Sequence, residues 1–226
     1  MRSDPQPKNP NRLVFSIVVC CFVALALITF RVMHSDSTRF VFLIWNLFLA
    51  IIPLLFSWWL VERLKNHPWL APKQILISLG WFLFLPNSFY LITDFIHLRP
   101  TYEASLVYDA VLFASFAICG LIFGFISLYM VHLELKKRLS PKETSLIVGS
   151  ILLACSFAIY LGRFTRWNSW DVLLKPAGLL FDVSDRVVNP IAHYETYETT
   201  IIFFLLLAST YWVIWETASY LKSGKN

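Results

Sequence analysis

The segment WFLFLPNSFYLITDFIHL, residues 81–98, interrupts a long apolar run with proline, amide, phenol, carboxylate and imidazole side chains. On a helix with about 3.6 residues per turn, four of these side chains fall at positions i, i+3, i+7 and i+10: Asn87, Tyr90, Asp94 and His97. Side chains with this spacing lie within one narrow arc of a helix. The segment therefore predicts one polar face on an otherwise apolar helix.

The composition of the chain is that of a membrane protein. Of its 226 residues, 58% are hydrophobic and 15% are charged, whereas soluble domains contain roughly 25% charged residues. The apolar residues come in blocks of around twenty, the length that a helix needs to cross about 30 Å of hydrocarbon. They do not alternate with polar residues as in the strands of a membrane barrel. The expected fold class is therefore all-α, with about six transmembrane helices.

We expect a single membrane domain over residues 1–226. The first apolar run is longer than the hydrophobic core of a cleaved signal peptide, which has roughly 7–15 residues, so we expect it to be an uncleaved span. The predicted spans are 13–33, 40–60, 74–98, 105–131, 145–161 and 199–220, and the longest polar connection is the outer loop 162–198.

The distribution of Lys and Arg predicts the orientation of the chain. The amino-terminal segment, the second and fourth loops and the tail carry twelve of them, and the other three loops carry seven. Basic loops face the cytoplasm, so both termini are expected there. Asp94 and His97 then lie roughly 30 Å from the cytoplasmic start of the third span, at the outer interface. The net charge of +5 fits this topological role, and no continuous basic stripe indicates a nucleic-acid partner.

Asp94 and His97 are the candidate catalytic residues. They lie three positions apart on one helix face, a spacing that permits a hydrogen-bonded acid and base pair. A carboxylate near an apolar environment is costly unless it is paired or functional. An ordinary solvated helix end is the competing interpretation. One histidine with scattered carboxylates does not specify a metal, and the four cysteines lie inside apolar segments, so no metal or cofactor is expected.

Pro86 and Asn87 predict an irregularity inside the third span. Proline removes one backbone donor and frees the carbonyl four residues earlier. Asn87 could accommodate the resulting kink by bonding that carbonyl, or it could reach a neighbouring helix. A functional interpretation is that the kink opens a polar cavity, since irregular backbone at membrane depth is tolerated where it lines one.

A second polar cluster, GRFTRWNSWD at residues 162–171, follows the fifth span. On a continuing helix Arg163 and Arg166 share a face, and the planar guanidinium fork suits phosphate or carboxylate recognition. Tryptophans and arginines also anchor helices at membrane interfaces, so anchoring remains the alternative. In the loop beyond, residues 173–181 place apolar side chains at helical spacing. This pattern is typical of a segment lying in the outer interface. We expect a re-entrant or surface-lying cap over the polar site, with an irregular loop as the alternative.

Together, the pattern LPNxxYxxTDxxHL at residues 85–98 and GRFxRWNSWD at residues 162–171 resembles the bacterial membrane-protein family called domain of unknown function 1361. The resemblance implies a polytopic protein of the bacterial cytoplasmic membrane and supplies no substrate. It adds to Asp94 and His97 a set of candidate ligand-binding residues: Asn87, Tyr90, Thr93, Arg163, Arg166, Asn168, Trp170 and Asp171.

These observations leave three hypotheses for function. The first is an outward-facing polar pocket that binds an anionic small molecule or a lipid head group. The second is an outer-leaflet enzyme acting on a lipid-linked substrate, with Asp94 as general base and the arginines neutralising phosphate charge. The third is a structural or assembly partner whose polar residues hold helices together. Membrane lipids are the expected partners in each case, and the sequence indicates no particular protein partner.

Overall fold

The structure, a computed structural model, describes residues 10–100 and 104–223, and this part of the chain contains helices and no strand. Six helices are long and apolar enough to cross a membrane, which confirms the all-α class and the six spans. Arg2, Lys8 and Lys225, which contribute to the predicted orientation, lie outside the described residues. The elements are α1 (Pro10–Ser35), α2 (Phe42–Leu64), α3 (Pro72–Tyr90), the 3-10 helix η1 (Leu91–His97), α4 (Leu106–Lys136), α5 (Pro141–Phe164), α6 (Asp171–Leu174), α7 (Pro176–Val188) and α8 (Tyr194–Ser223).

The starts of the long helices follow from local sequence. Ser105 caps α4, because its hydroxyl accepts a hydrogen bond from the Tyr108 amide. Ser140 and Glu143 form a reciprocal capping box at the start of α5, where Pro141 occupies the first turn. Proline also occupies the first turn of α3. The capping serines and the prolines thus mark where α3, α4 and α5 begin, each directly after a loop.

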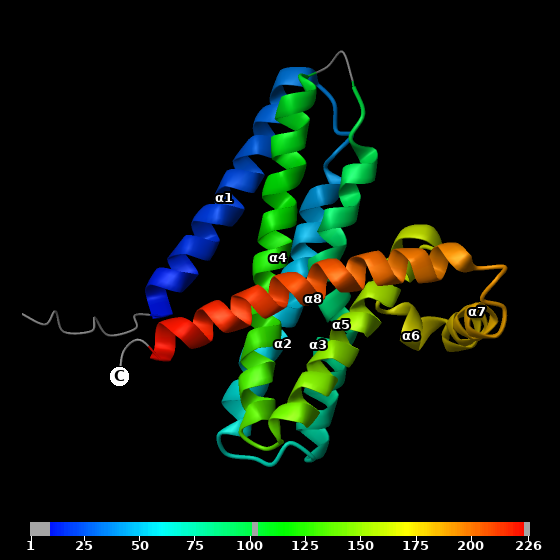
Figure 1. The fold of residues 1–226 in the computed structure, drawn as a ribbon. Helices are drawn as coiled ribbons and strands as arrows, with labels where there is room; N and C mark the ends of the chain where they lie inside the picture. Colours follow the sequence, from blue (N-terminus) through cyan, green and yellow to red (C-terminus); the bar gives the residue numbers. More distant parts are fainter. Residues whose placement is uncertain (1–9, 101–103, 224–226) are drawn as a thin grey trace, which may run out of the picture.

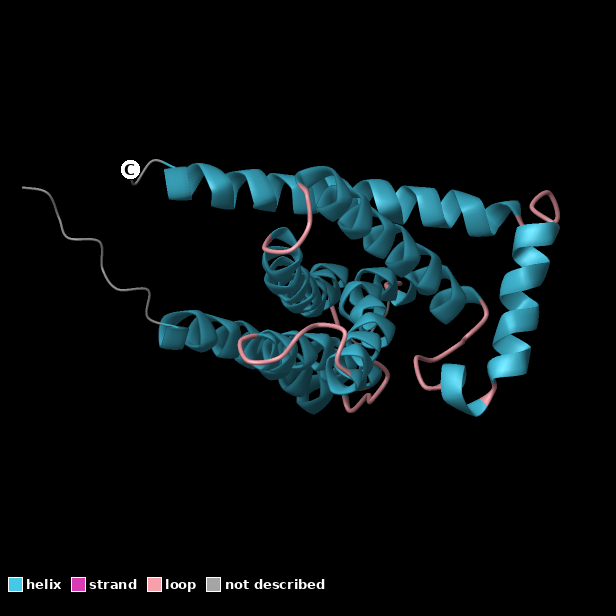
Figure 2. Ribbon diagram, turned by 90° about the horizontal axis from the view of Figure 1, so that it is seen from below, coloured by secondary structure: helices cyan, strands magenta, loops and turns pink. Residues whose placement is uncertain are grey.

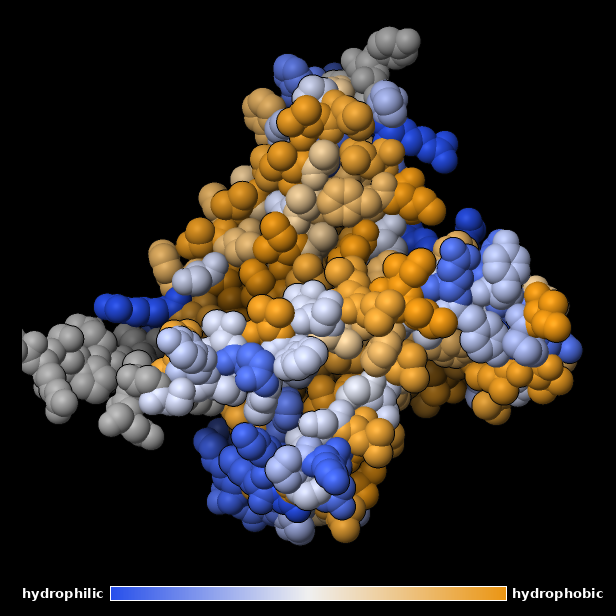
Figure 3. Space-filling view, in the orientation of Figure 1, coloured by the Kyte–Doolittle hydropathy of each residue, from blue (hydrophilic) through white to orange (hydrophobic). Residues whose placement is uncertain are grey.

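The helices α2, α3, α4 and α5 form the centre of the bundle (Figure 1). Helix α1 packs against α4, and α8 runs across the bundle, transverse to α4, and packs against α5. Hydrophilic residues gather at the end of the molecule where α2 joins α3 and α4 joins α5 (Figure 3). The opposite ends of α3 and α5, where η1 and α6 follow, carry the polar clusters that the sequence singled out.

Two apolar clusters hold the helices together. One lies between α2, α3, α4, α5 and α8 and includes the fully buried Leu85, Phe89 and Leu128. The other lies between α1, α2 and α4 and includes Phe113 and Phe116. Helices α2 and α4 contribute to both clusters, and α4, the more buried of the two, is the central helix of the bundle.

Helix α4 approaches α3 closely at a GxxxG motif, a pattern that brings membrane helices into backbone contact. A Cβ atom on Gly120 would lie 2.3 Å from the Ser88 carbonyl oxygen, and one on Gly124 would lie 2.5 Å from the Phe89 ring. The Ser88 hydroxyl donates to the Ala50 carbonyl of α2 at 2.7 Å. This close contact fixes α3 between α2 and α4 immediately before η1.

We predict that Gly120→Ala lowers the free energy of unfolding by about 1–3 kcal/mol, the usual cost of overpacking, because the new methyl group meets backbone rather than a flexible side chain. The matched control is Gly149→Ala on α5, where a Cβ meets nothing within 4 Å. This control should be neutral or stabilising by up to about 1 kcal/mol. Unfolding in mixed micelles measures both variants, and equal stabilities would contradict the close contact.

The spacing of its polar residues suggested that the third span is one continuous α-helix. The structure shows that it is not. It changes to a 3-10 helix after Tyr90. The Thr93 hydroxyl donates to the Tyr90 carbonyl at 2.6 Å, so the side chain engages the acceptor three residues back, which 3-10 geometry uses. In a 3-10 helix side chains three apart eclipse one another. Asp94 and His97 consequently stay aligned despite the change of helix type.

The connection 162–198 is mostly helical, so the alternative of an irregular loop is wrong. Helices α6 and α7 are separated at Lys175, whose φ of −138° and ψ of 50° lie outside the helical region; Pro176 follows directly. Figure 2 shows α7 at the side of the bundle, linking α6 to the start of α8. Several large apolar side chains of this region are more than half exposed, among them Leu173, Leu180 and Phe181. Such a surface fits a helix that lies in a membrane interface.

The junction of α7 and α8 is predicted to loosen at acidic pH. Hydrogen bonds from Asn189 and His193 hold the pKa of Asp185 below its ordinary value of 3.8. A carboxylate with a lowered pKa stabilises the folded state above its ordinary pKa, and this contribution is lost as the pH falls through the lowered value. Amide exchange of residues 186–196, corrected for intrinsic rates, should therefore rise below about pH 4. Asp185→Asn should remove this pH dependence, and an unchanged profile would contradict the role of Asp185.

Candidate functional site

Arg163, at the end of α5, is the centre of the polar site. Its Nε donates to Thr93 Oγ1 at 2.9 Å, one terminal nitrogen donates to Asp94 Oδ1, and the other lies 3.0 Å from His97 Nε2. The guanidinium carbon is also 4.4 Å from the centre of the Tyr90 ring. One side chain thus contacts four of the residues that the sequence patterns placed near one another.

Asp94 is buried, with 1% of its side chain exposed. Its second carboxylate oxygen accepts a hydrogen bond from Asn46 Nδ2 of α2 at 2.8 Å. The solvated helix end that competed with a functional role is therefore wrong for Asp94. Because both oxygens are engaged, the carboxylate links η1 to α2 and α5.

His97 is exposed and does not pair directly with Asp94 in the described structure; both side chains instead contact Arg163. A guanidinium can only donate, so His97 Nε2 is the acceptor of that bond. The neutral imidazole then carries its proton on Nδ1. His97 therefore offers one N–H donor while its ring packs edge-on against Phe42, with the ring centres 5.2 Å apart.

Asn87 reaches across to the segment between α5 and α6. Its Nδ2 donates to Ser169 Oγ at 2.8 Å and to the Phe84 carbonyl at 3.0 Å. Ser169 in turn donates to the Leu83 carbonyl at 2.8 Å. Of the two roles predicted for the amide, contact with a neighbouring segment is the one observed. The carbonyl freed by Pro86 is that of Phe82, and Asn87 does not bond it.

Arg166 does not share a helix face with Arg163, because α5 ends at Phe164. Its φ of 60° is left-handed, a conformation that glycine usually supplies after a helix. The Trp167 amide then donates to the Leu161 carbonyl at 3.1 Å. The chain turns back here, and Arg166 becomes exposed beside His97 rather than lying along α5.

These residues line an open cavity of about 520 Å³, which we call the basic pocket. Its lining consists of Tyr90, Ile96, His97, Arg99, Gly162, Arg163, Arg166 and Asn168. Among these described residues three are arginines and none is acidic. Within the described chain no hydrogen bond or ion pair engages Arg99 or Arg166. Arg99 and Arg166 therefore present their guanidinium groups to the pocket. The guanidinium of Arg163 lies in the same lining, but Thr93, Asp94 and His97 already engage it.

Trp170 and Asp171 lie beside this pocket rather than in its lining. Asp171 is buried and accepts hydrogen bonds from the Asn168 amide at 2.8 Å and from Asn168 Nδ2 at 3.2 Å. This local turn fixes Asn168 at the pocket wall. Trp170 is the residue that precedes α6. Direct ligand contact by either residue stays a prediction.

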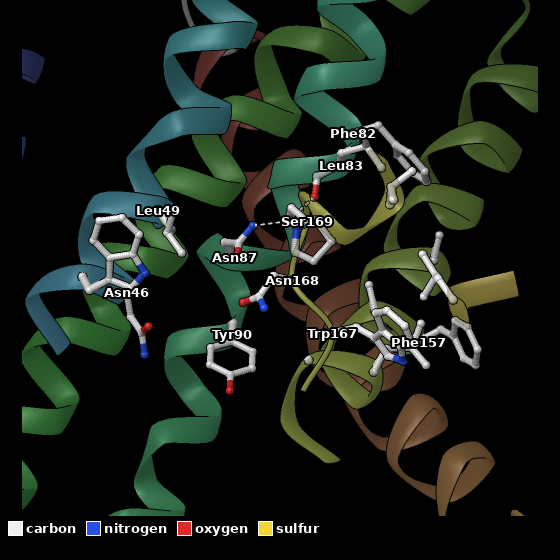
Figure 4. Close-up of a pocket in the computed structure, with 18 residues that line it drawn as sticks. Asn46, Leu49, Phe82, Leu83, Asn87, Tyr90, Phe157, Trp167, Asn168 and Ser169 are labelled. Carbon is white, nitrogen blue, oxygen red and sulfur yellow. Dashed lines mark hydrogen bonds between the residues drawn. The ribbon is translucent and has the colours of Figure 1, made fainter. Parts of the chain in front are cut away.

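A second cavity of about 360 Å³, which we call the apolar groove, lies between α2, α3 and α5. Figure 4 shows Asn87, Asn168 and Tyr90 in the space between α2 and α5, with Leu49 on one side and Phe157 on the other. The groove and the basic pocket share three lining residues, Tyr90, Gly162 and Asn168. The two cavities therefore adjoin along a wall that these three residues form.

Sequence reasoning missed several residues that build the site. Asn46 holds Asp94, and Arg99 lines the basic pocket. Trp167 donates to Asp182 Oδ2 at 2.7 Å and so ties the turn to α7. A lone amide inside an apolar span and an arginine directly after the polar segment were the available signals for the first two. The described residues contain no group of three or more His, Cys, Asp or Glu that could hold a metal.

Residues 45–212 match the protein family described as Protein of unknown function (DUF1361), so the predicted family resemblance is confirmed. No curated protein and no solved structure matches the chain. The matched range contains the residues of both cavities, from Trp45 to Leu179, whereas α1 precedes it.

Proposed function

The chain belongs to this family of unknown function, and we propose that it is a multi-pass protein of the bacterial cytoplasmic membrane that binds an anionic ligand in the basic pocket. With both termini in the cytoplasm, as the basic loops suggest, the pocket opens at the outer interface. Phosphate and carboxylate groups are the ligands that arginine forks recognise best.

The observation that carries this proposal is the composition of the basic pocket. Arg99 and Arg166 are exposed and converge with His97 on one cavity, and no acidic residue stands among its described lining residues. Solvated arginines that merely anchor a helix need no shared cavity.

The geometry favours binding over catalysis by Asp94. A general base must come within hydrogen-bond reach of the proton that it removes. Asp94 is buried, and Arg163 and Asn46 occupy its two oxygens. We therefore assign Asp94 and Arg163 to building the pocket, while Arg99, Arg166, His97 and Asn168 contact the ligand.

Replacing Arg166 tests the proposal, because glycine suits the left-handed backbone and removes the guanidinium. A charge-assisted hydrogen bond contributes about 1.5–3 kcal/mol, so Arg166→Gly should weaken binding of inorganic phosphate or glycerol phosphate about tenfold or more. The free energy of unfolding should stay equal or rise by roughly 1 kcal/mol, since the strain is relieved. Calorimetric titration of the purified protein measures affinity, and chemical unfolding measures stability.

The matched control is Lys175→Gln, which removes an exposed positive charge outside the pocket. This variant should bind both anions with the affinity of the unmodified protein. If neither anion binds the unmodified protein, or if Arg166→Gly binds as well as the control, the proposal fails. Loss of stability in Arg166→Gly without loss of binding would instead assign Arg166 a purely structural role.

A further inference from the structure

The apolar groove lies within the membrane-spanning part of the chain. Its walls come from α2, α3 and α5, and they include Leu49, Phe82, Phe157 and Ala158. The volume of about 360 Å³ falls within the range of small-molecule sites, roughly 300–1,000 Å³. A cavity of this size with apolar walls suits hydrocarbon rather than an ion.

The groove is accessible from the hydrocarbon layer. Trp45 and Phe82 stand at its rim with 55% and 37% of their surfaces exposed, and both belong to membrane spans. In a bilayer, exposed side chains at these depths contact lipid. A hydrocarbon chain can therefore enter the groove sideways, without leaving the apolar phase.

The apolar groove adjoins the basic pocket along a wall formed by Tyr90, Gly162 and Asn168. The chain is tightly packed at this wall, because a Cβ atom on Gly162 would lie 3.2 Å from the Tyr90 ring. Asn168 places its amide group at the shared wall, and Asn87 places its amide group in the groove. From the membrane outward, the chain thus offers apolar walls, then amide groups, then arginines. A phospholipid has its parts in the same order: a hydrocarbon chain, an ester region and a phosphate.

We propose that the ligand of the basic pocket is a membrane lipid with an anionic phosphate head, one of whose hydrocarbon chains occupies the apolar groove. This inference rests on the proposed function and deepens it, because it selects a lipid over a free anion. The phosphate meets Arg99 and Arg166, and the chain lies between α2 and α5. A soluble anion would use the arginines and leave the adjoining groove without a role.

A groove-filling variant separates the chain from the head. Ala158→Phe places a ring in the groove, whereas Leu153→Phe on the same helix adds a ring at an exposed position outside it. The protein is reconstituted in phosphatidylcholine nanodiscs with a small share of phosphatidic acid, and retained lipid is measured by native mass spectrometry. Inorganic phosphate binding is measured separately by calorimetry.

We expect Ala158→Phe to lower phosphatidic acid retention about tenfold while it leaves phosphate affinity unchanged, and Leu153→Phe to change neither. Arg166→Gly should lower both. If Ala158→Phe retains phosphatidic acid normally, the inference is overturned while the proposed function stands. If the unmodified protein binds neither phosphate nor phosphatidic acid, the proposed function fails as well.

A measurement on the unmodified protein guards against misfolding of the variant. Phosphatidic acid with a photoreactive diazirine in its chain should label peptides of the groove wall, residues 45–49, 82–87 and 154–161. Unlabelled phosphatidic acid should compete with this labelling, and phosphatidylcholine should not. Labelling spread over α1 and α8 without competition would overturn the inference.

Discussion

Arg163→Met should lower the free energy of unfolding by about 3–5 kcal/mol, the cost of leaving one member of a buried ion pair without its partner. Asp94 is 1% exposed and Arg163 is 11% exposed, so water does not replace the lost guanidinium. Ordinary hydrogen bonds between membrane helices contribute only about 0.6 kcal/mol each. A loss of several kcal/mol therefore identifies the unpaired buried charge as the main cause, rather than the lost hydrogen bonds to Thr93 and His97.

The double variant Asp94→Leu with Arg163→Met is the control for this prediction. Replacing a buried ion pair by apolar residues of similar size is often neutral or stabilising by about 1–4 kcal/mol, so the double variant should recover most of the stability. Unfolding in mixed micelles gives the free energies of the unmodified protein, of the two single variants and of the double variant. If Arg163→Met is as stable as the unmodified protein, the pair is not buried as described. If the double variant is less stable than either single one, the pair is not the source of the loss.

Asp109→Leu should also lower the free energy of unfolding by about 3–5 kcal/mol, but it should affect a different part of the bundle. Arg31 Nε donates to Asp109 Oδ1 at 2.8 Å, and the side chains are 2% and 1% exposed. Arg31 belongs to α1, which packs against α4. Removing the carboxylate takes the ion-pair partner on α4 away from the buried Arg31 guanidinium and should detach α1.

The separation of α1 and α4 in nanodiscs, measured between spin labels on the two helices, reports this detachment directly. Asp109→Leu should lengthen and broaden that separation, and the added change Arg31→Met should restore it. Phosphate binding should survive in both variants, because the basic pocket lies at η1 and the end of α5. An unchanged separation in Asp109→Leu, or loss of phosphate binding with α1 still in place, would contradict this division of roles.

From the sequence, it was easier to predict which residues lie close together than to predict which contacts they make. The helical spacing of the third span and the arginines after the fifth span placed Asp94, His97 and Arg163 together, because polar groups in a membrane segment must find one another. The same reasoning could not tell that Arg163 would be engaged by Asp94, since the order of contacts depends on where α5 ends. The change to 3-10 geometry coincides with the hydrogen bond from the Thr93 hydroxyl to the Tyr90 carbonyl, and hydrophobic periodicity does not reveal this change.

The partners contributed by other helices were the hardest to predict. Asn46 and Asp109 are polar residues inside apolar spans, a visible signal, but the sequence does not say which helix lies opposite each of them. The contact between Gly120 and Ser88 depends on two helices coming close, although the GxxxG spacing indicates that approach. Helix α7 was foreseen only as apolar spacing after residue 172, since Pro176 and Gly178 weaken the helical pattern.

Native mass spectrometry of the protein purified from its own membrane tests the central claim most directly. The unmodified protein, Arg166→Gly and Lys175→Gln are compared under identical conditions. Anionic ligand binding in the basic pocket predicts a discrete bound mass of an anionic phosphate lipid that is retained in Lys175→Gln and lost in Arg166→Gly. The same bulk lipid distribution in all three proteins, with no discrete mass lost in Arg166→Gly, would contradict it.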